Sequence, residues 1–69
     1  MDKKENTKRV CAFLAGKYNV KICDYDKTAI IVAYITEKQL AELCRELNCS
    51  GYYSDIAGKG IITNFGEYK

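Results

Sequence analysis

The chain has 69 residues, of which 48% are hydrophobic and 29% charged, and its formal net charge at pH 7 is +2. This length gives one small domain with a modest core and excludes a second domain. The composition argues against a disordered chain, and no apolar run approaches the roughly 20 residues that a membrane helix needs, so we expect no membrane partner.

The first expected element is a helix that begins at Thr7, a good N-cap residue. The apolar positions that follow recur at helical spacing: Val10, Cys11, Leu14 and Tyr18. Residues 1–6 are polar and are predicted to form a flexible N-terminus before a single α+β domain over residues 7–69. Because the charged start does not lead into a sustained apolar segment, secretion is disfavoured and we expect a cytoplasmic protein.

Two strands follow, VKICDY and TAIIVAYI, joined by a tight turn at Asp26 and Lys27. A two-residue loop would pair Tyr25 with Thr28 and form a β-hairpin. In that register the side of the sheet that faces the helices carries Val20, Ile22, Ala29, Ile31, Ala33 and Ile35. The opposite side carries Lys21, Cys23, Tyr25, Ile30, Val32 and Tyr34.

A second helix and a second hairpin complete the chain. Thr36 and Gln39 form a predicted capping box that opens EKQLAELCRELN, whose leucines line one helical face. YYSDIA and IITNF then flank the turn GKG. Pairing Ile56 with Ile61 directs Tyr52, Ile56, Ile61 and Phe65 inward, and it directs Tyr53, Asp55, Ile62 and Asn64 outward.

The predicted fold class is α+β. Two amphipathic helices can cover one face of a four-stranded sheet, which gives a two-layer sandwich in the order α-β-β-α-β-β. A right-handed crossover through the second helix would place TAIIVAYI and IITNF in the centre of the sheet, in a permuted ferredoxin-like arrangement. The second face of the sheet is then left open.

The stretch AIIVAYITEKQLAELCRELNCSGYYSDIAGKG, residues 29–60, resembles the first strand, helix and second strand of ferredoxin-like regulatory modules of the PII and ACT type. The resemblance implies a ferredoxin-like fold and a module that oligomerises and binds small effectors or protein partners. This chain is much shorter than a PII protein and lacks room for the long nucleotide-sensing loop. Nucleotide binding is therefore not carried over, and Lys59 receives no role from the family.

The chain has four cysteines and no histidine, so a structural zinc site would have to use cysteine thiolates. No Cys-x-x-Cys pair is present, and Cys11 and Cys44 fall on helix faces expected to pack, so we expect no metal and no cofactor. Cys49, just past the second helix, is the thiol expected to be most exposed. It lacks the base that a nucleophile requires.

Two short polar motifs are best explained as turns. Asp24 and Asp26 could bind a cation or share a proton, but aspartate is also a common turn residue. The glycines of GKG could form a phosphate-binding nest around Lys59, yet no helix N-terminus follows, and a hairpin turn explains both glycines. Without an assembled catalytic constellation, we expect that the protein is not an enzyme.

The open sheet face is the predicted binding surface, because it would expose more apolar and aromatic area than a monomer usually does. The predicted partner-binding residues are Lys21, Tyr25, Ile30, Val32, Tyr34, Tyr53, Ile62 and Asn64. If the strand register slips by one residue, the two faces exchange and these residues form the core instead.

The leading hypothesis is a non-enzymatic protein-binding module. It would act as a small regulator or stoichiometric inhibitor, a class that includes the phage-borne proteins that block host defence enzymes. It would dock a larger protein or a second copy through its sheet face or an exposed edge strand. One alternative is single-stranded nucleic-acid binding by stacking on tyrosines, although the charge is modest. Another is a small-ligand-sensing module with a site between subunits near the GKG turn.

Overall fold

The computed structural model describes residues 2–67, which form two helices, four strands and one 3-10 turn. In chain order these are α1 (Lys3–Tyr18), β1 (Lys21–Tyr25), β2 (Ala29–Ala33), α2 (Glu37–Leu47), β3 (Ser50–Ser54), η1 (Ile56–Gly58) and β4 (Lys59–Thr63). The strands form one sheet in the order β1-β2-β4-β3, and all neighbouring strands are antiparallel.

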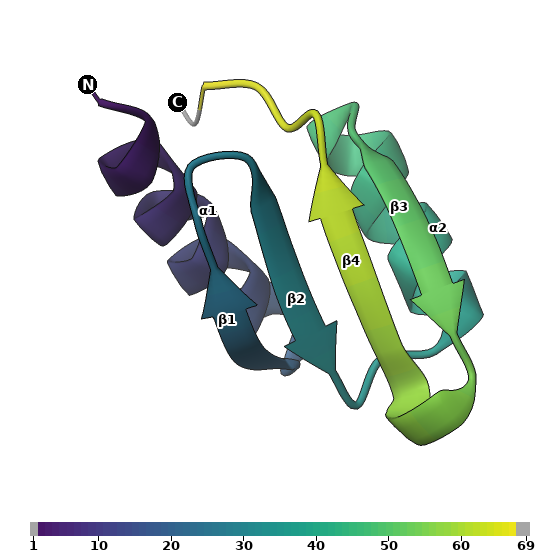
Figure 1. Ribbon diagram of the computed structural model, residues 1–69. Coiled ribbons are helices and arrows are strands. Elements are labelled where there is room, and N and C mark those ends of the chain that lie inside the picture. The colour runs from purple at the N-terminus through teal and green to yellow at the C-terminus, as the bar shows by residue number, and fades with distance from the viewer. Residues whose placement is uncertain (1, 68–69) are drawn as a thin grey trace.

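The molecule has two layers, and both helices lie on the same face of the sheet (Figure 1). α1 packs on β1 and β2, whereas α2 packs on β3. The central strands β2 and β4 come from the segments TAIIVAYI and IITNF. The predicted α+β sandwich with a permuted ferredoxin-like strand order is therefore confirmed.

α1 begins at Lys3, four residues before the predicted start. Asp2 is its N-cap, and the Asp2 carboxylate accepts a hydrogen bond from the Glu5 N–H at 2.9 Å. Thr7 lies one turn inside the helix and is completely buried. Its hydroxyl donates to the carbonyl oxygens of Lys3 at 2.9 Å and Lys27 at 3.4 Å, so it ties α1 to the first hairpin. The boundary predicted at Thr7 is wrong, because Asp2 provides an earlier cap. Met1 lies outside the described residues.

α2 follows the sequence prediction closely. Thr36 accepts a hydrogen bond from the Gln39 N–H, and the Gln39 side chain accepts one from the Thr36 N–H, which completes the capping box. Leu40 and Leu43 are buried on the face toward the sheet. The helix ends at Asn48 in the left-handed conformation, a common way to satisfy the last carbonyl groups of a helix.

The first hairpin corrects the predicted register. Its tight turn is shifted, because the Asp26 N–H donates to the Ala29 carbonyl at 3.0 Å and Tyr25 pairs with Ile30. A β-bulge lies between Ile22 and Asp24, where the register shifts by one residue. The bulge reverses the alternation of side chains, so Ile22 and Tyr25 both pack toward the core although they are three residues apart.

This bulge explains why the predicted faces of β2 are wrong. Without a bulge, the alternation of side chains along β1 puts Ile22 on the opposite side of the sheet from Ile30. The bulge instead brings Ile22 to the same side as Ile30 and Val32. Ile30 and Val32 have no exposed surface and lie in the core, and Ile31 faces away from the helices. Val20, Ile22 and Ile35 do contact the core, as predicted.

The predicted faces of the second hairpin are wrong for its isoleucines and its two tyrosines, whereas Phe65 packs against the core and Asp55 and Asn64 are exposed, as predicted. Ile61 pairs with Tyr52 rather than with Ile56, and Ile61 and Tyr52 are 42% and 67% exposed. Ile62 is fully buried and pairs with Ile30 across the two central strands. Ile56 lies in η1 and is 80% exposed. The core therefore contains Ile30 and Ile62 under the helices, together with Val10, Leu14, Val32, Ile35, Leu40 and Leu43.

Candidate functional site

The open face of the sheet is the side away from both helices, and it carries a row of four paired residues, which is acidic on β1 and apolar or aromatic on β2, β4 and β3. The pairing of the strands places Asp24 beside Ile31, Ile31 beside Ile61, and Ile61 beside Tyr52. Ile31 is half-buried, while Ile61 and Tyr52 are exposed. No element described over residues 2–67 covers this face, which is turned toward the viewer in Figure 1. We call these four residues the open-face row.

The two ends of the open face differ in charge. At one end Lys21 pairs with Ala33 and Lys59 pairs with Ser54, so two exposed ammonium groups lie on this side of the sheet. At the other end lie small residues that carry no charge: Ala29, Thr63 and Ser50. The face thus presents an apolar centre, the Asp24 carboxylate on its β1 side, and positive charge at one end.

The structure separates the predicted binding residues instead of gathering them. Ile30, Val32 and Ile62 belong to the core, so their placement on the open face is wrong. Tyr25 and Tyr53 are half-buried and pack against the core from the helix side, so they too were assigned to the wrong face.

The remaining predicted residues are exposed. Lys21 lies on the open face, as predicted. Tyr34 is 75% exposed in the connection from β2 to α2, where its φ of 61° takes it out of the strand and lets Ile35 return to the core. Asn64 follows β4 with a φ of 59°, and its side-chain amide donates to the Ser50 hydroxyl at 3.3 Å.

Ile31, Ile61 and Tyr52 are the open-face residues that the sequence interpretation assigned to the core. Each central strand contains two adjacent isoleucines, so hydrophobicity alone does not decide which one faces inward. Gly60 indicates which side of β4 faces the helices. A Cβ atom there would lie 3.3 Å from Leu40, which shows that α2 closely approaches the strand on the side of Gly60 and Ile62.

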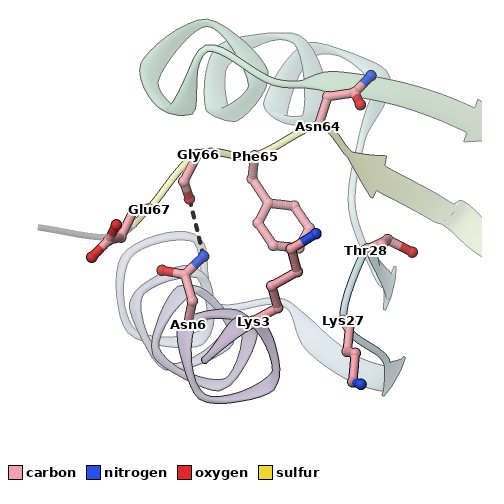
Figure 2. Close-up of a pocket in the computed structure, with 8 residues that line it drawn as sticks. All are labelled: Lys3, Asn6, Lys27, Thr28, Asn64, Phe65, Gly66 and Glu67. Carbon is pink, nitrogen blue, oxygen red and sulfur yellow. Dashed lines mark hydrogen bonds between the residues drawn. The ribbon is translucent and has the colours of Figure 1, made fainter. Parts of the chain in front are cut away.

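A cavity of about 420 Å³ lies where the end of β4 meets the start of α1 (Figure 2). Phe65 forms one wall, and the side chains of Lys3, Lys27 and Thr28 surround the opening (Figure 2). The Asn6 amide donates to the Gly66 carbonyl at 3.1 Å and holds the C-terminal segment against α1. The lysines are exposed, so salt would screen their attraction for an anion.

All four cysteines are free thiols. Burial raises the pKa of Cys11 to about 11, and burial together with the neighbouring Cys44 raises the pKa of Cys49. Both thiols are therefore protonated at neutral pH and poor nucleophiles. Cys23, at the bulge, is the exposed thiol, and Cys49 is only partly exposed, so the exposure predicted for Cys49 is wrong. Within residues 2–67, no three Cys, Asp or Glu side chains form a group that could hold a metal ion.

Asp26 acts as a turn residue, as the sequence suggested. Its carboxylate accepts hydrogen bonds from the Thr28 N–H at 2.7 Å, the Ala29 N–H at 2.9 Å and the Thr28 hydroxyl at 3.1 Å. These bonds, led by that of the Thr28 N–H, lower the pKa of Asp26. In the GKG motif Gly58 has a φ of +55°, which fits the predicted turn, whereas Gly60 belongs to β4.

Neither helix in the described part of the chain is long and apolar enough to cross a membrane. The fold and the exposed row define a small α+β sandwich with one uncovered sheet face. The chain matches no family model, no curated protein and no solved structure among those compared with it. The resemblance of residues 29–60 to PII and ACT modules therefore gains no support from these comparisons.

Proposed function

We propose that this protein is a non-enzymatic protein-binding module of the cytoplasm that docks a protein partner on its open sheet face. The observation that supports this is the open-face row, in which Ile31, Ile61 and Tyr52 lie side by side without a covering element. Adjacent exposed isoleucine and tyrosine side chains lose unfavourable contact with water when a partner covers them. A regulator or stoichiometric inhibitor needs nothing more than such a surface.

The surface also favours a particular chemistry in the partner. Tyr52 supplies a large apolar ring with a hydroxyl group that can form a hydrogen bond, which is typical of residues that dominate interface energies. Lys21 and Lys59 favour carboxylates on the partner beside the end of the face that they occupy. We therefore infer a partner with an apolar centre and acidic residues on one side.

The nucleic-acid alternative is less favoured by this geometry. It required Tyr25, Tyr34 or Tyr53 to stack on bases, and two of these rings pack toward the core. The small-ligand alternative needs a site between subunits near GKG, whereas the cavity in Figure 2 lies beside the start of α1 and the residues after β4. The open-face row remains the feature best suited to a binding function.

The proposal is tested with Ile61→Glu as the binding variant and Ile56→Glu as its matched control. Both isoleucines are exposed, but Ile56 lies in η1, away from the open-face row. Proteins captured from cells by the wild-type chain would be identified, produced separately, and titrated against all three chains by calorimetry. We expect Ile61→Glu to weaken binding by at least about 100-fold, because it buries an unpaired charge, and Ile56→Glu to bind like the wild type.

Circular dichroism of each variant would show that its fold is retained. A partner that binds Ile61→Glu as tightly as the wild-type chain would contradict the proposal. Tyr52→Ala provides a second, uncharged variant on the same row, and we expect it to weaken binding as well.

A further inference from the structure

The two edges of the sheet are protected to different degrees. The β1 edge carries Lys21 and Asp24 and is interrupted by the bulge at Cys23. Charges and bulges are devices by which proteins prevent an edge strand from pairing with another chain. The β3 edge has the sequence SGYYS, with no charge and no proline, and it pairs with β4 in a regular register. β3 is therefore the edge open to a further strand.

A hollow of about 460 Å³ lies beside this edge, between α2 and β3. Its lining residues are Glu37, Leu40, Ala41, Cys44, Gly51, Tyr52 and Tyr53. The hollow reaches the edge at Gly51, which is exposed and has no side chain. A strand added along β3 would direct alternate side chains toward the helix layer, next to this hollow.

We propose that β3 pairs antiparallel with β3 of a second copy of this chain, with the two-fold axis at Tyr52, so that two sheets join into one of eight strands. This register matches the serines at the two ends of SGYYS. It places Ser50 opposite Ser54 of the second copy, and Gly51 opposite Tyr53 of the second copy. Tyr53 of each copy then lies next to Gly51 of the other chain and beside its hollow.

The charges on α2 fit the same two-fold axis. A Cβ atom at Gly51 would lie 2.5 Å from the Cys44 sulfur and 3.1 Å from Leu40, and a Cβ atom at Gly60 would lie 3.3 Å from Leu40. Gly60 pairs with Tyr53, so Leu40 is level with the middle of β3, and the axis passes close to Ala41. Ala41 is small and exposed, which allows the two α2 helices to approach each other.

Glu37 and Arg45 lie four residues before and after Ala41, on the same side of the helix. In an antiparallel pair of helices centred on Ala41, Glu37 of each copy faces Arg45 of the other. Neither residue takes part in the ion pairs found within residues 2–67. The second copy would therefore supply each residue with an opposite charge, twice in one dimer.

This dimer does not depend on the open-face function, because the β3 edge and the open-face row are different surfaces. It would extend that function, however. The two open faces would become continuous, and Tyr52 of each copy would lie at the centre of the joined surface. A partner would then contact two copies of the row at once.

The charge pairs give a test that does not disturb the core. In a dimer of the Glu37→Arg variant, each introduced arginine faces Arg45 of the other copy, which gives two pairs of like charges. In a dimer of the Arg45→Glu variant, each introduced glutamate faces Glu37 of the other copy, which again gives two pairs of like charges. We expect each variant by itself to dimerise at least about tenfold more weakly than the wild type. We expect an equimolar mixture of the two variants to form a heterodimer as readily as the wild type dimerises, because both charge pairs are then complementary. Sedimentation velocity from micromolar to millimolar concentration measures this.

Glu42→Arg is the matched control, because it makes the same charge change about 100° around the helix from Ala41, and we expect it to dimerise like the wild type. A wild-type chain that stays monomeric at millimolar concentration would overturn the proposal, as would single variants that dimerise as tightly as the wild type. Ile61→Glu distinguishes the two proposals, since we expect it to lose the protein partner and keep the dimer.

Discussion

The exchange of the two sheet faces can be tested with one pair of neighbouring residues in β4. Ile62 is fully buried opposite Ile30, whereas Ile61 is 42% exposed on the open face. Ile62→Val and Ile61→Val remove the same methylene group and keep the β-branched shape that strands prefer. Any difference between the two variants therefore reports burial.

The structure sets the size of that difference. At Ile62 the lost methylene is worth about 0.8 kcal/mol of transfer free energy, and a small cavity raises the cost to about 1 kcal/mol. At Ile61 water and neighbouring side chains fill the space, so we expect about 0.3 kcal/mol. For a domain of this size, 1 kcal/mol corresponds to a fall of roughly 4–8 °C in Tm.

Urea unfolding followed by circular dichroism gives the free energy of unfolding of each variant. The measurement would be repeated at two protein concentrations, so that self-association is not mistaken for intrinsic stability. If Ile61→Val proved as destabilising as Ile62→Val, the assignment of Ile61 to the open face would be refuted. The same comparison between Ile30→Val and Ile31→Val extends the test to β2.

Two further predictions concern the contacts that hold the first hairpin in place. We expect Thr7→Val to lower the free energy of unfolding by about 0.5–1.5 kcal/mol in urea titrations, because it removes the hydroxyl that bonds Lys3 and Lys27; an unchanged stability would contradict that role. Asp26 has a lowered pKa in the folded protein, so its contribution to stability is present above its unfolded pKa of about 3.9 and is lost as the pH falls below that value. We therefore expect the fall in the urea midpoint between about pH 7 and about pH 3 to be smaller for Asp26→Asn than for the wild type, and an equal fall would show that the turn bonds do not favour the carboxylate.

Local signals in the sequence were enough to predict the fold class. The capping box at Thr36 and Gln39 and the spacing of the leucines marked α2. The apolar strands around the turns indicated two hairpins, and the predicted order of the strands agrees with the sheet. These features depend on hydrogen bonds and spacing within a few residues, so they can be recognised without tertiary structure.

The candidate site could not be predicted in the same way. Its residues depend on which of two adjacent isoleucines in each central strand faces inward, and both choices bury a similar apolar side chain. The edge proposal likewise depends on a bulge in β1 and a hollow beside β3, and both are properties of packing between elements.

The sequence by itself determined the elements, their order and the presence of more apolar strand surface than two helices can cover. Only the tertiary structure decided which side of the sheet became the core. The bulge at Cys23 turns Ile22 to the side of Tyr25 and Ile30, and the close contact of Leu40 with Gly60 fixes α2 on that same side. Because side chains in a strand alternate, these two contacts left Ile31, Ile61 and Tyr52 on the face that a partner can reach.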